Sequence, residues 1–159
     1  MDEIFEGQCT CGEVQYQLRS KPLFVNCCHC FWCQQQTGSA FVINAMIEKD
    51  RVEIVKGEVV TVDLPTPSGK GQRVIRCPKC QVALWSHYLA GNKSLSFVRV
   101  GTLNNPHLLP PDIHIYTTSK QPWVILPDNI PIKKGYYAPK NYWPEESQQR
   151  YAALSKKKS

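Results

Sequence analysis

Eight cysteines constrain this chain more than any other feature, because they fall into three tight groups. Spacings of the C-x-C and C-x-x-C type place two thiols on one tight turn, which is a common way for proteins to hold a tetrahedral metal ion. The three groups read Cys9-Thr10-Cys11-Gly12, Cys27-Cys28-His29-Cys30-Phe31-Trp32-Cys33 and Cys77-Pro78-Lys79-Cys80. The spacing therefore favours metal chemistry over scattered, independently packed thiols.

The first and third groups together predict a closed zinc site. Four thiolates at about 2.3 Å complete the tetrahedral shell of a structural Zn²⁺. Such a site requires the fold to bring the start of the chain next to its middle. The predicted ligands are Cys9, Cys11, Cys77 and Cys80. The alternatives for these four residues are buried free thiols or a redox-active C-x-x-C pair.

The middle group predicts a different kind of site. Cys28, Cys30 and Cys33 offer three thiolates with no obvious fourth partner nearby, and three protein ligands with one open position are typical of a catalytic zinc. An oxidisable thiol cluster is the competing interpretation. Because neighbouring residues of an extended chain point to opposite faces, Cys27 and His29 should point away from that metal. Cys27 is then best interpreted as a small packed hydrophobe.

The composition and the distribution of turn-forming residues predict one mainly β domain. The chain has 159 residues, 42% of them hydrophobic, and twelve prolines that disfavour long helices. Helices are expected only in two places. One runs from about Cys30 to Thr37 and would end at Gly38, and the other begins at Pro144. Strands are expected at 14–18, 41–47, 52–55, 59–64, 74–76, 83–88, 95–100, 112–117 and 123–126.

The charge pattern gives little support to a polyanionic partner. The formal net charge is +6, but the basic residues are scattered, and the densest run is the terminal Lys156-Lys157-Lys158. Seven metal-bound thiolates and two Zn²⁺ ions would reduce this charge to about +3. A nucleic-acid partner is therefore not expected. No apolar run approaches the roughly 20 residues of a membrane helix, and no secretory signal is evident, so a reducing, cytoplasmic location is expected.

An ordered series of motifs resembles the glutathione-dependent formaldehyde-activating enzyme family, also described as the CENP-V/GFA domain, within the Mss4-like fold. The motifs are Gly7-Gln8-Cys9-Thr10-Cys11-Gly12, Cys28-His29-Cys30-Phe31-Trp32-Cys33, Thr37-Gly38-Ser39-Ala40-Phe41, Arg76-Cys77-Pro78-Lys79-Cys80, Val100-Gly101-Thr102-Leu103, Pro111-Asp112-Ile113-His114-Ile115 and Lys120-Gln121-Pro122-Trp123. The resemblance implies several coiled antiparallel sheets around a structural zinc. It also implies a zinc domain over 4–140, followed by a C-terminal helix and basic tail over 141–159.

For function, the resemblance implies a carbon-sulfur lyase with glutathione as co-substrate. The second zinc, on Cys28, Cys30 and Cys33, would hold the thiol, which would add to formaldehyde or a similar small carbonyl. The partners would thus be a small-molecule thiol and a carbonyl compound. A zinc-dependent thiol carrier without turnover is the alternative. His114 lies in a family-like motif, but a strand histidine is more typically structural than catalytic.

The sequence departs from the family pattern at two positions. Gln81 follows Cys80 where the family usually has glycine, so this turn must accept a less permissive residue. Cys27 adds a thiol beside the open cluster, and both a disulfide and an altered ligand set there are consistent with the sequence.

Overall fold

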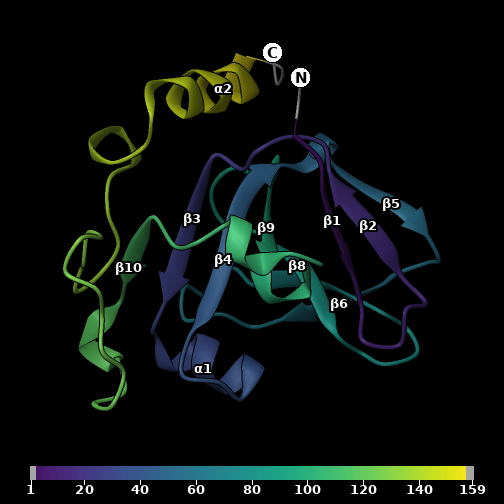
Figure 1. The fold of residues 1–159 in the computed structure, drawn as a ribbon, viewed down its shortest axis with the longest axis horizontal. Helices are drawn as coiled ribbons and strands as arrows, with labels where there is room; N and C mark the ends of the chain where they lie inside the picture. Colours follow the sequence, from purple (N-terminus) through teal and green to yellow (C-terminus); the bar gives the residue numbers. More distant parts are fainter. Residues whose placement is uncertain (1–2, 157–159) are drawn as a thin grey trace.

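The computed structural model, which describes residues 3–156, contains two β-sheets (Figure 1). The smaller sheet has the order β1-β2-β5, and its strands are β1 (Phe5–Gln8), β2 (Gln15–Leu18) and β5 (Val52–Lys56). The larger has the order β10-β3-β4-β9-β8-β7-β6. Its strands are β3 (Phe24–Cys28), β4 (Val42–Glu48), β6 (Val60–Leu64), β7 (Gln72–Arg76), β8 (Ala83–Tyr88), β9 (Leu95–Arg99) and β10 (Ile113–Ile115). The mainly β prediction is confirmed.

Every strand pairing within 3–156 is antiparallel except one, between β10 and β3, which is parallel. The expectation of antiparallel sheets therefore needs this one correction. A parallel pair requires a crossover connection, and here the chain between the two strands runs through the rest of the large sheet.

Both predicted helices are present. Helix α1 (Phe31–Thr37) begins after Cys30, whose side chain accepts a hydrogen bond from the Cys33 amide, and it ends at Gly38 in a left-handed conformation. Helix α2 (Glu145–Lys156) has two acidic residues in its first turn. The described part of the chain also has 3-10 helices at η1 (Lys49–Arg51), η2 (Val100–Thr102), η3 (Pro106–Leu108), η4 (Thr117–Ser119) and η5 (Pro139–Asn141). Lys157 and Lys158 of the predicted basic tail lie outside the described residues.

The first hydrophobic core lies between the two sheets. The rings of Tyr16 on β2 and Trp85 on β8 meet at a centroid distance of 5.2 Å, and the Tyr16 hydroxyl is 2.6 Å from Thr102 Oγ1. A Cβ atom at Gly7 would lie 2.6 Å from the Tyr16 ring, so only glycine allows this approach. These contacts fix the small sheet against β8.

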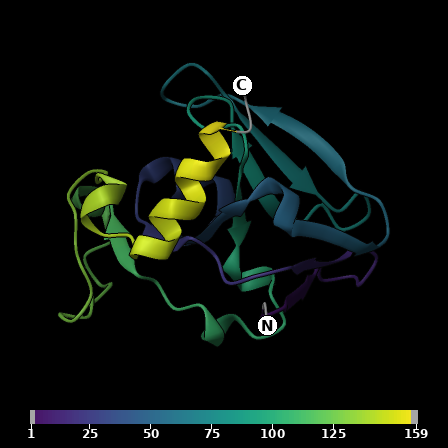
Figure 2. The same cartoon turned by 90° about the horizontal axis from the view of Figure 1, so that it is seen from above.

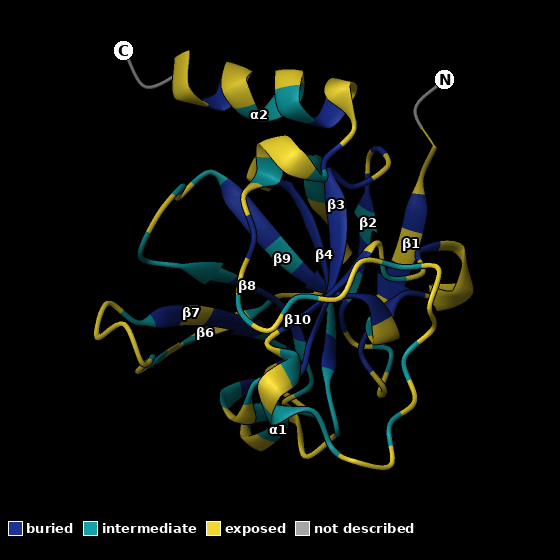
Figure 3. Ribbon diagram, turned by 90° about the vertical axis from the view of Figure 1, so that its left-hand side faces the viewer, coloured by how far each residue is buried: buried dark blue, intermediate teal, exposed yellow. Residues whose placement is uncertain are grey.

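A second core covers the opposite face of the large sheet. There the C-terminal segment and α2 pack on β3 and β4, as Figure 2 shows from above and Figure 3 by burial. Successive residues of β3 alternate between the cores: Val25 belongs to the first, and Phe24 and Cys28 to the second. Both faces of β3 are thus covered, and all five of its residues are buried.

One expected strand did not form, and two strands formed where none was expected. Residues 123–126 form no strand; Trp123 and Ile125 are 72% and 91% exposed. This segment lies between Pro122 and Pro127, each of which lacks an amide donor for a sheet. Conversely, β1 and β3 lie where no strand was expected. None of the helices within 3–156 is long and apolar enough to cross a membrane.

A buried ion pair attaches α2 to the large sheet. Arg150 donates to both carboxylate oxygens of Glu48 at 2.8 and 2.6 Å, and it also reaches the Lys21 carbonyl and the Ser20 hydroxyl. The Glu48 side chain is only 5% exposed. Removing Arg150 would leave this carboxylate buried, with Arg51 at 3.6 Å as its nearest cation among the ion pairs found.

We expect Arg150→Met to lower the free energy of unfolding by about 2–3 kcal/mol, because Glu48 loses a two-pronged partner away from water. The matched control is Arg73→Met. Arg73 binds Asp63 with the same two-pronged geometry, but both side chains are about half exposed, so its loss should cost much less stability than the loss of Arg150. Urea unfolding measures both, and equal losses would contradict the argument from burial.

Candidate metal centres

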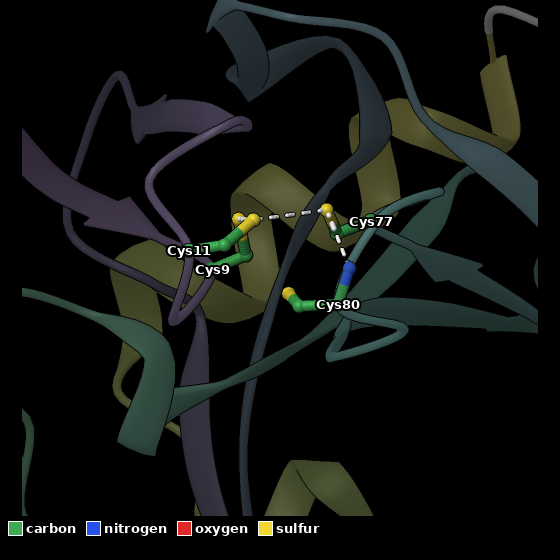
Figure 4. Close-up of side chains that lie close together, drawn as sticks. All are labelled: Cys9, Cys11, Cys77 and Cys80. Atoms are coloured by element: carbon green, nitrogen blue, oxygen red, sulfur yellow. Dashed lines mark hydrogen bonds between the residues drawn. The ribbon is translucent and has the colours of Figure 1, made fainter.

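The four predicted structural ligands come together at the tips of two hairpins (Figure 4). Cys9 and Cys11 lie in the turn between β1 and β2, and Cys77 and Cys80 lie in the turn between β7 and β8. Their sulfur atoms all lie within 4.8 Å of one another, with Cys9 to Cys11 at 3.5 Å and Cys11 to Cys77 at 3.7 Å. Sulfurs at the corners of a zinc tetrahedron lie about 3.8 Å apart. The donor set therefore fits Zn²⁺.

Backbone amides point at these sulfurs as they do at thiolates. The Val14 amide donates to Cys9 Sγ at 3.3 Å, and the Cys80 amide donates to Cys77 Sγ at 3.5 Å. A hydrogen bond from Thr10 and further backbone amides lower the pKa of Cys80 to about 5. A backbone hydrogen bond at Glu13 lowers the pKa of Cys11, but desolvation and hydrogen bonds with the other three cysteines outweigh it and raise this pKa to about 11. Full deprotonation of the cluster therefore needs the positive charge of a bound cation.

Gln81, which follows Cys80 where the family usually has glycine, adopts a backbone conformation that few residues other than glycine tolerate. Its φ is +63°, in the left-handed region that glycine adopts most easily. The Gln81 amide donates to the Cys77 carbonyl at 3.0 Å, and its side chain donates to the Pro78 carbonyl at 2.8 Å. The side chain thus makes a local bond that glycine would not offer.

A pair of variants isolates the backbone strain at this turn. Gln81→Ala and Gln81→Gly both remove the side-chain bond to Pro78, but only alanine keeps the cost of a Cβ at positive φ. We expect the glycine variant to be more stable than the alanine variant by about 0.5–1 kcal/mol, after allowing for the greater freedom of unfolded glycine. Thermal unfolding of the zinc-loaded proteins tests this order, and a more stable alanine variant would refute it.

The three residues of the predicted open site also meet. Cys28 ends β3, Cys30 precedes α1, and Cys33 lies in the first turn of α1, with their sulfurs within 4.8 Å of one another. Cys28 and Cys33 are buried, whereas Cys30 is partly exposed. No further His, Cys, Asp or Glu among residues 3–156 joins this group. Three soft donors with solvent access on one side fit a zinc ion that keeps one free position.

The three thiols strongly affect one another's ionisation. Hydrogen bonds from Cys28 and then from Cys33 lower the pKa of Cys30 to about 2, whereas hydrogen bonding to Cys30 raises the pKa of Cys28. One of the three thiols therefore loses its proton readily, and the negative charge of that thiolate opposes deprotonation of the others. A bound cation supplies the positive charge that full deprotonation of such a cluster needs.

Arg99 places a buried positive charge beside this cluster. It lies on β9 and is 7% exposed. The hydrogen bond with Cys28 lowers the pKa of Cys33, but the hydrogen bond with Cys30 and burial outweigh it and raise this pKa to about 11, and the charge of Arg99 opposes the rise. Its guanidinium donates to Asn44 and, at 3.4 Å, to Gln36 of α1, and its Nε has no partner within the described chain. Sequence inspection missed Arg99, because nothing in its motif indicates that it reaches the cysteines.

Two aromatic side chains next to the cluster remain accessible to solvent. Phe31, the residue after Cys30, is 64% exposed, and Tyr116 is 40% exposed. Tyr116 has a φ of +54°, an uncommon conformation for a tyrosine. Burial raises the pKa of its phenol, and negative charge on the three cysteines raises it further. Tyr116 therefore remains protonated near neutral pH and lies within electrostatic range of the sulfurs.

The remaining thiol, Cys27, joins a third group with His29 and His114. As the strand alternation predicts, Cys27 and His29 are separate from the group of Cys28, Cys30 and Cys33. All eight cysteines are free, so the disulfide that the sequence allowed at Cys27 is absent. The third group was not predicted, because it depends on the parallel pairing that sets His114 directly opposite Cys27.

Comparison with known proteins agrees with the motifs. The family described as "Glutathione-dependent formaldehyde-activating enzyme" matches residues 4–119, which is most of the chain. The chain belongs to this family. A crystal structure of a Rhodobacter sphaeroides protein is similar, with 19% identity and a TM-score of 0.48 over 62% of this chain and 87% of that one. No curated protein matches the sequence significantly.

The match to the formaldehyde-activating family covers all three cysteine groups and His114, and it ends before α2. The family takes its description from a glutathione-dependent reaction of formaldehyde, and membership suggests a function of that type.

Proposed function

We propose that this protein is a zinc-dependent carbon-sulfur lyase that adds a glutathione-type thiol to formaldehyde or a similar small carbonyl compound. The observation that carries the proposal is the incomplete ligand set of Cys28, Cys30 and Cys33, which is partly open to solvent. The family description supplies the substrate class. We further propose that Cys9, Cys11, Cys77 and Cys80 hold a separate structural zinc.

A zinc ion on the three cysteines would supply a Lewis acid that favours the thiolate form of a thiol at its free position. The protein's own residues define where that thiol can approach. Cys28 and Cys33 are buried, so the exposed side of Cys30, flanked by Phe31, is the accessible side. The exposed ring of Phe31 offers an apolar surface there.

The reaction needs one proton to be moved. A carbon-sulfur bond forms between the thiol sulfur and the carbonyl carbon, the thiol loses its proton, and the carbonyl oxygen gains one. The Tyr116 hydroxyl is the candidate donor, since its phenol lies within electrostatic range of the three cysteines and is 40% exposed. The proton that the thiol releases then restores the phenol. In the reverse direction a proton moves from the hydroxyl of the adduct back to the sulfur as the carbon-sulfur bond breaks.

Cys30→Ser tests the catalytic role of the open group. Serine is a good helix N-cap, so it should keep the bond from the Cys33 amide that starts α1. We expect the rate of adduct formation to fall to that of glutathione and formaldehyde alone, because the ligand set is broken. Exchange NMR between glutathione and its hydroxymethyl adduct measures the rate. The control is Gln35→Ala, an exposed position on the same helix, which should keep the wild-type rate.

The same measurement separates an enzyme from a carrier. If the wild-type protein binds glutathione saturably but leaves the exchange rate unchanged, it is a non-catalytic thiol-binding protein and the lyase proposal is wrong. Full turnover by Cys30→Ser would instead exclude the open cysteine group as the catalytic centre.

Arg99 should support the metal at the open site. Three thiolates and one Zn²⁺ carry a net charge of −1, which the buried guanidinium balances. We expect Arg99→Met to weaken zinc binding at this site by about 10- to 100-fold, and Arg99→Lys, which keeps the charge, to weaken it less. Competition with a chromophoric chelator gives the affinity of each site. An equal loss at the four-cysteine site would mean that the substitution acts through general destabilisation.

A further inference from the structure

Cys27, His29 and His114 form a group that the proposed reaction does not use. The residues are 1%, 0% and 7% exposed. His29 Nε2 lies 2.9 Å from His114 Nδ1 and 3.6 Å from Cys27 Sγ. Three different segments, β3, the residues before α1, and β10, thus contribute donor atoms to one small buried volume.

Hydrogen bonding alone accounts poorly for this arrangement. Both short contacts converge on His29 Nε2, and an uncharged imidazole nitrogen has either one hydrogen or one lone pair to offer. The other ring nitrogen of His29, Nδ1, is buried and has no partner among the described residues. A metal ion held by His29 Nε2, His114 Nδ1 and Cys27 Sγ would account for both contacts at once, whereas Nδ1 of His29 is not a ligand in this arrangement.

The donor set suits a particular class of metal ion. One thiolate and two imidazoles are typical ligands of borderline soft cations such as Zn²⁺, and they suit Mg²⁺ and Ca²⁺ poorly. In a zinc tetrahedron a sulfur and a nitrogen lie about 3.6 Å apart and two nitrogens about 3.3 Å. The sulfur-nitrogen distance already agrees, and the two imidazoles need to separate by only about 0.4 Å.

The backbone holds this group apart from the neighbouring cysteines. Cys27 pairs with His114 across β3 and β10, and the His29 amide donates to the Ile115 carbonyl at 3.0 Å. The Lys133 amide bonds the carbonyl of His114 at 2.8 Å, which fixes β10 from its other side. The three donors are therefore held by sheet hydrogen bonds, on the opposite side of the strand from Cys28.

We propose that Cys27, His29 and His114 form a third metal site, separate from the two cysteine sites, that binds a thiophilic divalent cation of the Zn²⁺ type. The site does not depend on the proposed lyase activity. The side chains are too buried for a substrate to reach the ion directly, so its role is to fix the junction of β3, α1 and β10 beside the open cysteine group.

The test is a count of bound metal ions in the full, untagged chain. After loading with Zn²⁺ under reducing conditions and desalting, mass spectrometry of the native protein should find three ions per chain. Cys27→Ser and His114→Gln should each retain two. The control His87→Gln, a half-buried histidine outside the three groups, should retain three.

A second measurement needs no variant. Loading the wild-type chain with ¹¹³Cd²⁺ should give three cadmium NMR signals, one of them upfield of the others, because a site with one sulfur and two nitrogens shields cadmium more than a site with three or four sulfurs. Two ions per chain and no such signal would overturn the proposal. Three ions retained by both variants would also overturn it.

Discussion

The convergence of two hairpin turns on one group of four sulfurs is the constraint on which the rest of the structure depends. Cys11 and Cys77 are 66 residues apart, and they lie in turns that join strands of different sheets. Where their turns meet, the small sheet is set against β8, and Tyr16 can pack on Trp85. A metal ion there would act as a cross-link that closes a long loop, which is where a cross-link restricts the unfolded chain most.

The alternation of side chains along β3 explains how one short stretch serves two chemically different groups. Cys28 faces the second core and joins Cys30 and Cys33, whereas Cys27 faces the other side and meets His114. Because both faces of β3 are covered, neither group can move without disturbing a core. The same burial that makes β3 rigid also holds the partly exposed sulfur of Cys30 in position at the start of α1.

The spacing of the cysteines along the chain made the grouping of the proposed metal ligands predictable. Paired spacings identified Cys9, Cys11, Cys77 and Cys80 as one group, and the structure brings these four together. Long-range pairing was not predictable in this way. The parallel contact of β10 with β3 joins residues 87 positions apart with no signal in either segment, so His114 remained an isolated strand histidine, and Arg99 was missed for the same reason. Trp123 was misassigned because its hydrophobicity suggested a strand, while the flanking prolines prevented one.

Ligand number and burial together distinguish the three groups. Cys11 is exposed, yet its group already offers four donors, so exposure there gives a substrate no free position on a metal. Cys30 is only partly exposed, but its group lacks a fourth donor among the described residues, so in the proposed reaction a thiol from solution would complete it. The third group also has three donors, but all of them are buried, and a metal there is shielded from solutes. The proposed chemistry with an external thiol therefore has its candidate location at the group that is both incomplete and accessible.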